Sequence, residues 1–448
     1  MVAPVTDSSR SAPSGTPLRF LIAAGVAETL LLGTLAWWPG AAFPNVALAL
    51  FGSAFAVYAV TSFRVGDTPG GYLWIWFFAV LMRLVLLPQD PSISDDIFRY
   101  LWDGDVQRAG INPYLYPPAA EELAHVRTGY HALINNPTIS TIYGPFAQMA
   151  FWAISMAGGT LLQAKLLWVG CDLATGWVID RIALATGRSR RKALVLYLWS
   201  PLLIVEVAWS GHLEPLGILA MMLAVFLARK PLLAGLALAC AVATKFAPIV
   251  ALPVLARRWG WRAVAGFTIT LLLLYARYLS AGAGLFAGLS TYAEHWWFMK
   301  GPFVLLEAVF PDPIVARRAA AAVVAGVVVW GILRRVSAET ALFFVLGTGM
   351  IFTPTLHPWY VLWMLPFAAL RSSRPWILMT GLVFLGYYGL ASYQASGDWL
   401  QPRWLRAAMW LPFLGWLVYD AWKGLGAPAG PSEEGTPGPE SGAPEPPG

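Results

Sequence analysis

The sequence has little charge, little lysine and almost no cysteine. Only 12% of its 448 residues are Asp, Glu, Lys or Arg, against about 25% in water-soluble globular proteins. This shortage of polar surface excludes a cytosolic enzyme of two or three soluble domains, which the length alone would allow. The two cysteines, Cys171 and Cys240, both lie within apolar stretches, which argues against a disulfide framework or a cysteine metal site.

The sequence is instead rich in long apolar segments. Hydrophobic residues make up 58% of the chain, and segments near or above the roughly 20 residues that cross a bilayer recur. We therefore predict an all-α fold, a polytopic transmembrane helix bundle of about 11–14 membrane segments in one domain over residues 17–425. The expected segments are 17–38, 44–63, 71–88, 161–186, 191–209, 213–229, 262–280, 315–334, 340–355, 358–370, 375–394 and 403–422.

Two further apolar stretches do not fit a simple span. Phe146–Gly158 is short, and Pro231–Ala256 is interrupted by Lys245-Phe246-Ala247-Pro248. We predict that each is a re-entrant helix, which enters only part of the membrane, since broken helices persist only where protein covers them or water reaches them. The chain has no internal sequence repeat, which argues against a transporter built from inverted halves.

The basic residues set the expected orientation. The net charge of +6 comes from 24 Arg and 6 Lys in short clusters between apolar runs, a pattern typical of cytoplasmic loop flanks and not of nucleic-acid binding. Placing the clusters that begin at Arg188, Arg229, Arg257 and Arg334 in the cytoplasm puts Asp90–Gly144 outside. The five histidines then lie at or near the extracytoplasmic face of the cell membrane, where we expect the chemistry: His125, His131, His212, His295 and His357.

Both ends of the chain are expected to be disordered and cytoplasmic. Residues 1–16 are rich in Ser, Pro and Ala and lack the apolar core of a signal peptide. Residues 426–448 are largely Pro, Gly and Glu and include no aromatic residue. Such compositions bury too little apolar area to fold.

The external loop, residues 90–144, is acidic in a basic protein. It holds seven acids and three Arg. At helical spacing, Ile97, Phe98, Leu101 and Trp102 share one side of the run that follows Ser94, which predicts a short helix along the membrane surface. The acids would then face a cavity at the interface.

Asp95 and Asp96 admit two interpretations. In the structural one, Ser94 caps the helix and the two acids occupy its first turn, where the helix dipole favours negative charge. In the functional one, one of them is a general base that takes a proton from an acceptor hydroxyl.

A resemblance to a known superfamily favours the functional interpretation. Ser94-Asp95-Asp96-Ile97-Phe98-Arg99-Tyr100, then Trp102-Asp103-Gly104 and Gly110-Ile111-Asn112-Pro113-Tyr114, resembles the first external loop of the GT-C membrane glycosyltransferases. Four later pieces, in the same order, look like the bacterial mannosyltransferase-like branch that uses polyprenyl-phosphate sugars: Thr141-Ile142-Tyr143-Gly144-Pro145, Ser210-Gly211-His212-Leu213-Glu214, Lys245-Phe246-Ala247-Pro248 and His357-Pro358-Trp359-Tyr360. Relatives often have Tyr-Pro-Pro at the first piece, and Asn or Asp after the histidine of the second.

This resemblance implies an inverting hexosyltransferase. It would move a sugar, mannose, from a polyprenyl-phosphate carrier to a hydroxyl of a lipid or glycan acceptor, among membrane lipids and with no nucleic-acid partner. No cofactor and no metal are expected, because the superfamily often works without metal and the carboxylates of Asp103-Gly104-Asp105 would diverge on a helix. The excess of Arg over Lys suggests a GC-rich bacterial source.

Matching positions imply residue roles. Asp95 corresponds to the catalytic carboxylate with Asp96 as its rival, and His357 would orient the base or donate to the phosphate. The residues expected to bind the donor phosphate are Lys245, Arg99, His212 and Tyr143. Those expected to contact the acceptor or the sugar are Glu214, Trp359 and Tyr360.

Each role has a structural alternative. Arg99 is also spaced for an ion pair with Asp96 or Asp103. Lys245, a lone ammonium in an otherwise charge-free apolar stretch, is costly unless it is paired, hydrated or at an interface. His357 would be a neutral histidine at a helix end, and Trp359 and Tyr360 part of an interfacial aromatic belt.

Two other functional classes share the expected architecture. A lipid-linked oligosaccharide ligase or polymerase would carry a basic catalytic loop late in the chain, whereas the long external loop here is early and acidic. A lipid or solute transporter is the second alternative, and the missing repeat and the acid-rich external segment argue against it.

Overall fold

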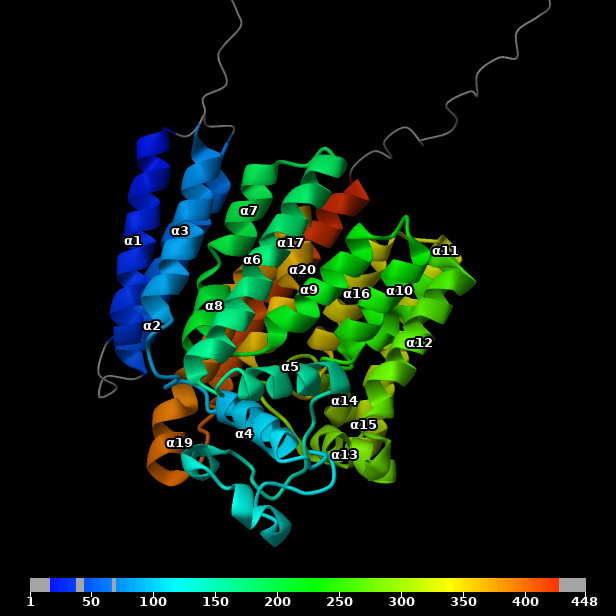
Figure 1. The fold of residues 1–448 in the computed structure, drawn as a ribbon. Helices are drawn as coiled ribbons and strands as arrows, with labels where there is room; N and C mark the ends of the chain where they lie inside the picture. The colour runs from blue at the N-terminus through cyan, green and yellow to red at the C-terminus, as the bar shows by residue number, and fades with distance from the viewer. Residues whose placement is uncertain (1–16, 38–43, 67–69, 427–448) are drawn as a thin grey trace, which may run out of the picture.

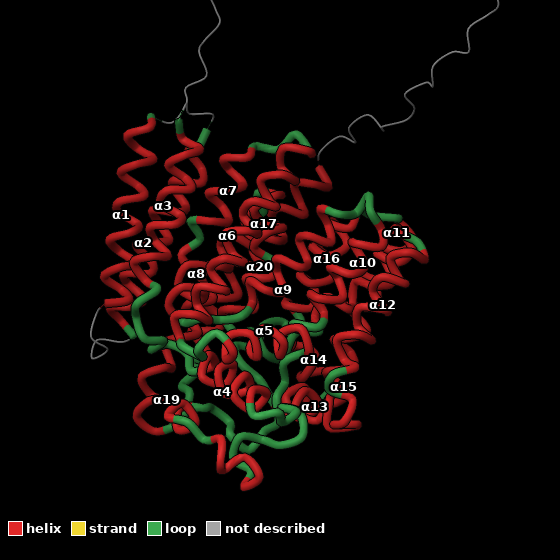
Figure 2. Tube along the Cα trace, viewed as in Figure 1, coloured by secondary structure: helices red, strands yellow, loops and turns green. Residues whose placement is uncertain are grey.

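The computed structural model describes residues 17–37, 44–66 and 70–426, and every regular element within these ranges is helical (Figures 1 and 2). The all-α prediction is confirmed. The expected disordered ends, 1–16 and 426–448, lie outside the described residues except for Gly426, which ends the last helix.

The α-helices are α1 (Leu18–Trp37), α2 (Asn45–Arg64), α3 (Gly71–Leu86), α4 (Asp96–Arg108), α5 (Pro145–Met156), α6 (Leu161–Ala185), α7 (Arg190–Leu198), α8 (Pro201–Ile204), α9 (Glu214–Phe226), α10 (Pro231–Val242), α11 (Leu252–Trp259), α12 (Trp261–Ala276), α13 (Ala287–His295), α14 (Phe303–Val309), α15 (Pro313–Arg334), α16 (Ala338–Ile351), α17 (Leu365–Arg371), α18 (Arg374–Leu382), α19 (Leu390–Ser396) and α20 (Arg403–Gly426). Single-turn and 3₁₀ segments join them at Glu121–Val126, Gly129–Leu133, Ala247–Ala251, Leu279–Phe286, Pro358–Trp363 and Val383–Gly389, and a π-helical turn covers Val205–Trp209.

Some of the helices are full membrane spans by length and composition, and others are short or bent. Within the described ranges four segments qualify: α1, α2, α15 and the stretch Arg374–Ser396. Two bent pairs bring the number to six: Arg190–Leu198 with Pro201–Trp209, bent by 48°, and Trp261–Ala276 with Leu279–His295, bent by 108°. Helices α3, α9, α10 and α16 are apolar but shorter. The expected number of membrane segments therefore depends on short and broken helices, and it stays a prediction.

The bundle has two chemically different ends. The start of α1 and the end of α20 lie at one end, and α4, α13 and α19 lie at the other, where loops gather (Figures 1 and 2). The basic clusters are at the first end, where Arg188 and Arg371 both pair with Glu339 and Arg258 donates to the Arg335 carbonyl. The acidic segment 90–144 therefore lies opposite the basic clusters, as the predicted topology requires, while its extracytoplasmic placement stays a prediction.

The break predicted at Lys245 is present. Helix α10 ends at Val242, and the chain turns through residues 243–251 before α11. A Cβ on Gly235 of α10 would lie 2.0 Å from the Ala263 carbonyl oxygen, so the glycine lets α10 touch the start of α12. Since α11 ends where α12 begins, both ends of this hairpin lie at the same end of the bundle, which is the shape of a re-entrant segment.

The second expected re-entrant stretch forms α5, which lies across the end of the bundle beside α4 (Figure 1). The apolar side of α4 is covered from below by the external loop itself, where Trp102 and Val106 pack with Leu123 and Ile134. This small cluster gives the loop a core of its own. The depth of α4 and α5 in a membrane stays a prediction.

Candidate active site

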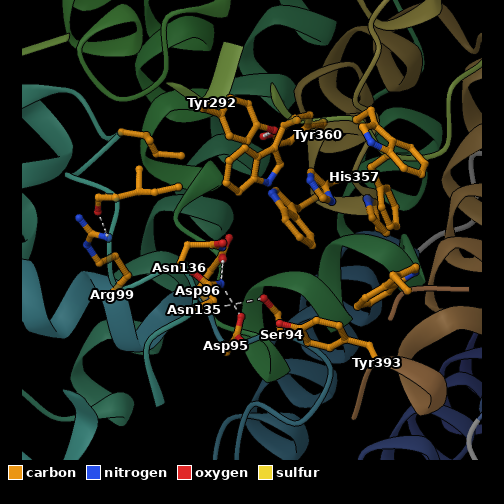
Figure 3. A pocket seen from close by; sticks show the side chains of 18 of the residues that line it. Ser94, Asp95, Asp96, Arg99, Asn135, Asn136, Tyr292, His357, Tyr360 and Tyr393 are labelled. Atoms are coloured by element: carbon orange, nitrogen blue, oxygen red, sulfur yellow. Dashed lines mark hydrogen bonds between the residues drawn. The ribbon is translucent and has the colours of Figure 1, made fainter. Parts of the chain in front are cut away.

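A polar cavity of about 620 Å³ lies at the end of the bundle that carries α4. Its wall includes eight of the predicted site residues: Asp95, Asp96, Arg99, Tyr143, Lys245, His357, Trp359 and Tyr360. The two acids lie on one side, and His357, Tyr360 and Tyr292 face them from the other (Figure 3). The remaining two, His212 and Glu214, are fully buried behind the wall. Folding thus brings together motifs that are up to 265 residues apart in the sequence (residue 95 to residue 360).

The two acids lie at the start of α4. Asp95 is the N-cap residue with no side-chain capping bond, and Asp96 is the first residue of the helix. Ser94 lies one position before the cap, although its Oγ accepts a bond of 3.4 Å from the Asp96 N–H. The expectation that Ser94 is the cap is therefore wrong by one residue, and neither carboxylate is used for capping. Both remain available to the cavity.

Asn135 joins the two carboxylates. Its Nδ2 donates to Asp95 Oδ1 at 2.5 Å and to Asp96 Oδ1 at 2.9 Å (Figure 3). A single amide group that donates to both oxygens fixes the pair and partly offsets the repulsion between the two negative charges.

The surroundings make Asp95 more basic than an ordinary aspartate. Burial, and then the neighbouring charge of Asp96, raise the pKa of Asp95 from 3.8 to about 6, while the Asn135 bond opposes the change. Burial also raises the pKa of Asp96, against the lowering effects of Asn135, Lys245 and Arg99. A general base works best when its pKa is close to the working pH while it is still ionised. Asp95 meets that condition near neutral pH.

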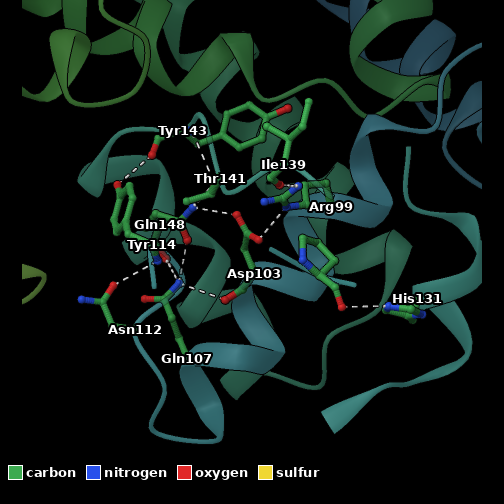
Figure 4. A network of polar contacts seen from close by, with 11 residues as sticks. Arg99, Asp103, Gln107, Asn112, Tyr114, His131, Ile139, Thr141, Tyr143 and Gln148 are labelled. Atoms are coloured by element: carbon green, nitrogen blue, oxygen red, sulfur yellow. Dashed lines mark hydrogen bonds and ion pairs between the residues drawn. The ribbon is translucent and has the colours of Figure 1, made fainter. Parts of the chain in front are cut away.

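Arg99 belongs to a polar network that fastens α4 to α5 (Figure 4). Its Nε donates to Asp103 Oδ1 at 2.8 Å and its Nη1 to the Ile139 carbonyl at 3.0 Å. Gln148 of α5 donates to Asp103 Oδ2 and to Thr141 Oγ1, both at 2.8 Å. The alternative ion pair of Arg99 with Asp103 is confirmed, and Arg99 also lines the cavity.

Asp103 and Asp105 diverge, as expected on a helix. Asp105 Oδ1 accepts from Ser155 Oγ at 2.6 Å, away from the Arg99 network. No three His, Cys, Asp or Glu side chains in the described ranges are grouped to hold a metal ion. The expectation of a metal-independent site stays a prediction.

Lys245 lies at the turn between α10 and the 247–251 segment. Its Nζ forms an ion pair with the buried Glu214 carboxylate and lies 4.7 Å from the centre of the Tyr360 ring. The pairing explains how a lone ammonium is accommodated in this apolar stretch. Its side chain is still 19% exposed, so the ammonium is reachable from the cavity.

A second, apolar cavity of about 440 Å³ continues from the first. Side chains of α15 and α16 line it, including Val324, Val345 and Met350. The two cavities share Lys245, Tyr143, Ile142, Tyr292 and Tyr360. Polar and apolar spaces therefore meet at the Lys245 ammonium.

Four rings form a stack, of which three line the polar cavity and the fourth, His212, is buried behind its wall. His357 lies between Phe298 and Trp359, with ring centres 4.5 Å away on each side, and His212 stacks on the far side of Trp359 at 4.0 Å. Burial, and then the charge of Lys245, lower the pKa of His357 to about 3. His357 is therefore neutral, so its ring offers hydrogen-bonding nitrogens but no charge.

Sequence reasoning missed several polar residues of this site, among them Asn135, Tyr292 and Glu206. Asn135 stands in a loop without a motif, and nothing local indicates that it reaches Asp95. Glu206, which lies behind the wall beside His212, was detectable because it is the one acid in the apolar segment 191–209. An ionisable residue inside a membrane segment is a functional candidate by default.

Comparison with known proteins shows the family to which the chain belongs. Residues 17–261, more than half of the chain, match the family described as "Alpha-(1->6)-mannopyranosyltransferase, N-terminal domain". The chain belongs to this family. The matched range contains Asp95, Asn135, Glu206 and Lys245, while His357 lies beyond it.

Two curated relatives of this mannopyranosyltransferase family are similar to the chain. An "Alpha-(1->6)-mannopyranosyltransferase A" from Corynebacterium glutamicum is 30% identical over 197 residues, which cover 42% of this chain and 39% of the relative. The protein of the same name from Mycobacterium tuberculosis is 26% identical over 286 residues, covering 58% of this chain and 52% of the relative. The similarity thus spans about half of each relative or less. No solved structure matches the chain.

Proposed function

We propose that the protein is an inverting mannosyltransferase, which transfers mannose from polyprenyl-phosphate mannose to a hydroxyl of a lipid or glycan acceptor at the extracytoplasmic face of the cell membrane. The observation that carries the proposal is the meeting of the two cavities at Lys245. Polyprenyl-phosphate mannose has matching parts: a long apolar chain for the apolar cavity, a single anionic phosphate for Lys245 and a polar sugar for the polar cavity. Membership in the mannopyranosyltransferase family supports mannose as that sugar.

The donor is placed by matching its parts to the two cavities. The prenyl chain lies in the apolar cavity that α15 and α16 help to line, the phosphate at Lys245, and the mannose in the polar cavity beside Asp95. Lys245 carries three N–H donors, so it binds a phosphate oxygen without giving up Glu214.

The reaction is a displacement at the anomeric carbon of mannose. The acceptor oxygen forms a bond to this carbon while the bond from the carbon to the phosphate oxygen breaks, and the phosphate leaves with the electron pair. Asp95 takes the hydroxyl proton. Lys245 stabilises the negative charge that develops on the leaving oxygen. Attack from the face opposite the phosphate inverts the configuration.

Asp96 and His357 support the Asp95 base and the Lys245 ammonium. Asp96 stays close to Lys245, Arg99 and Asn135, and its charge raises the pKa of Asp95. The neutral ring of His357 offers one donor or acceptor nitrogen to the sugar or the phosphate. No metal and no cofactor are assigned a role, since Lys245 meets the charge of the leaving group and the transfer involves no oxidation.

Reconstitution in liposomes separates this proposal from the alternatives. With radiolabelled polyprenyl-phosphate mannose and an acceptor extract, we expect single labelled mannose units on the acceptor. Asp105→Asn, the same chemical change outside the cavity, is the matched control for Asp95→Asn, which should abolish the product. Movement of intact donor across the bilayer without transfer would identify a transporter, and transfer of preassembled oligosaccharides would identify a ligase.

A further inference from the structure

Glu206 is a fully buried acid that the proposed reaction leaves without a task. It lies in the π-helical turn Val205–Trp209, where the Ser210 N–H bonds to the Val205 carbonyl at 3.0 Å, five residues back. Such turns are rare and are frequent at functional sites. The Glu206 carboxyl group lies beside the His212 ring, and the His212 backbone N–H donates to the Glu206 carbonyl at 2.9 Å.

His212 lies between two carboxyl groups. Its Nε2 is 3.3 Å from Glu206 Oε2, and its Nδ1 is 3.8 Å from Asp96 Oδ2. The stack on Trp359 holds the ring plane. Neither ring nitrogen, nor Glu206 Oε2, has a hydrogen-bond partner of good geometry among the described residues. Since buried polar atoms are nearly always bonded, and catalytic bonds often tighten only with substrate, the two carboxyl groups are the natural partners of the ring.

The charges around this ring decide which nitrogen carries the proton. Besides His212, the groups near Glu206 are Tyr387, Glu214, Asp96 and the Ser210 hydroxyl. Besides Glu206 and Asp96, the ionisable groups near His212 are Lys245 and His357. No Lys or Arg pairs with Glu206 in the described part of the chain, and the Tyr387 hydroxyl donates to its Oε1 at 2.8 Å. An isolated buried charge is far more costly than a neutral carboxyl group. Glu206 therefore retains its proton on Oε2 and donates it toward Nε2, which leaves the ring proton on Nδ1, facing Asp96.

We propose that Glu206 is a positioning residue, which fixes the tautomer of His212 and so keeps an N–H donor on the Asp96 carboxylate. This inference rests on the proposed transfer reaction for its consequence. Asp96 faces His212 Nδ1 through Oδ2 at 3.8 Å and accepts from Asn135 at Oδ1, and the same Asn135 amide donates to Asp95. The chain of contacts from Glu206 to Asp95 thus orients the base without itself touching a substrate.

Two pairs of substitutions test the chain of contacts in the transfer assay. A Gln amide donates to Nε2 as the neutral Glu does, so Glu206→Gln should lose less than about threefold in kcat. Glu206→Met, of similar size without a donor, should lose about tenfold to a hundredfold in kcat with little change in KM for the donor. An Asn at 212 places its N–H near the Nδ1 position and a Gln near Nε2, so His212→Asn should retain more activity than His212→Gln.

Unchanged kcat in Glu206→Met would overturn the inference, and so would a loss in Glu206→Gln as large as in Glu206→Met, since that would require an ionised carboxylate. If Glu206→Met does not fold, the order of the two His212 variants decides.

An inactive wild type would refute the proposed reaction alone, because the tautomer is measured without any substrate. In ¹⁵N-histidine spectra of the detergent-solubilised protein, we expect Nδ1 of His212 to be protonated in the wild type and in Glu206→Gln, and a measurably larger share of the ring to be protonated on Nε2 in Glu206→Met. A wild-type ring protonated on Nε2 would contradict the inference.

Discussion

The Lys245 ammonium and the Glu214 carboxylate form an ion pair at the point where the polar and the apolar cavity meet. Glu214 is fully buried, whereas Lys245 is partly exposed to the cavities. A buried ion pair is weak support for stability, but removing one partner leaves the other as an unpaired charge. The pair therefore allows a structural and a substrate-binding role of Lys245 to be separated by experiment.

Lys245→Met should weaken donor binding and stability together. Loss of a charge-assisted bond to the phosphate should raise the donor Kd about tenfold to a hundredfold, and the unpaired Glu214 should lower Tm. The double variant Lys245→Met/Glu214→Gln should recover Tm but not donor affinity, because it removes the unpaired charge without restoring the ammonium. Lys245→Arg should rescue binding only in part, because the guanidinium has a different shape and reach.

Binding and thermal unfolding are measured on one detergent preparation of each variant. Glu214→Gln alone is the matched control, since it keeps Lys245 and should keep donor affinity. A donor Kd that is unchanged in folded Lys245→Met would remove Lys245 from the donor site and leave it with the structural role alone.

Asp95→Asn should abolish turnover, with donor binding largely intact. The amide keeps the shape of the carboxylate but accepts no proton, and general-base catalysis is worth about 10²–10⁴-fold. Asp96→Asn should be milder, because Asp96 positions and polarises its neighbour. Turnover is compared with that of Asp105→Asn. If Asp96→Asn were the more damaging change, the two acids would exchange roles, and near-normal turnover in both variants would place the base elsewhere.

The pH dependence of kcat/KM should report the raised pKa of Asp95. The base must be ionised, so activity should fall about tenfold per pH unit below about pH 6. Removing the Asn135 bond in Asn135→Ala raises the pKa of both acids and should move this limb to higher pH. Asp96→Asn removes the neighbouring charge and should move it to lower pH. Shifts in the same direction would contradict the assignment.

The same pKa predicts how Asp95 affects stability. The folded protein holds the pKa of Asp95 near 6, above its ordinary value of 3.8, so folding favours the protonated form. Its stabilising contribution is complete below about pH 4 and is lost as the pH rises through 6. Asp95→Asn, which is neutral throughout, should therefore have a higher Tm than the wild type at pH 8 and a similar Tm at pH 4. A variant that is less stable at pH 8 would contradict the raised pKa.

Cysteine labelling tests the topology. Glu121 is 87% exposed in the loop that contains α4, and Arg335 is exposed at the opposite end of the bundle. We expect a membrane-impermeant maleimide to label Glu121→Cys in intact cells and Arg335→Cys only after the membrane is opened. The wild type, with Cys171 and Cys240, gives the background. The reverse pattern would place the cavity on the cytoplasmic face.

The sequence was sufficient to predict the helical class, the break at Lys245 and the helix that begins at Asp96, because each depends on local composition and spacing. It was not sufficient to predict where long apolar segments bend. The expected span 191–209 bends by 48° near Pro201, and the stretch that follows His357 begins as a 3₁₀ segment, Pro358–Trp363. Apolar length determines whether a segment enters the membrane, but its bends depend on the neighbours it packs against.

The residues of the candidate site also fall into two groups, those that the sequence was sufficient to select and those that only the tertiary structure shows. Asp95, Lys245 and His357 stand in sequence motifs, so a resemblance of motifs was able to select them before their positions were known. Asn135 enters the site only through the fold, because its donation to Asp95 spans 40 residues of the chain. The pairing of Lys245 with Glu214 likewise needed the tertiary structure, although each residue was selected separately.

A structure of Asp95→Asn bound to polyprenyl-phosphate mannose tests the central claim most directly. The account predicts the phosphate within hydrogen-bond reach of Lys245 Nζ, the prenyl chain in the apolar cavity that α15 and α16 help to line, and the anomeric carbon open to attack from the side of residue 95. A donor bound elsewhere, or one that places its sugar away from α4 with the phosphate beyond reach of Lys245, would contradict the proposed active site.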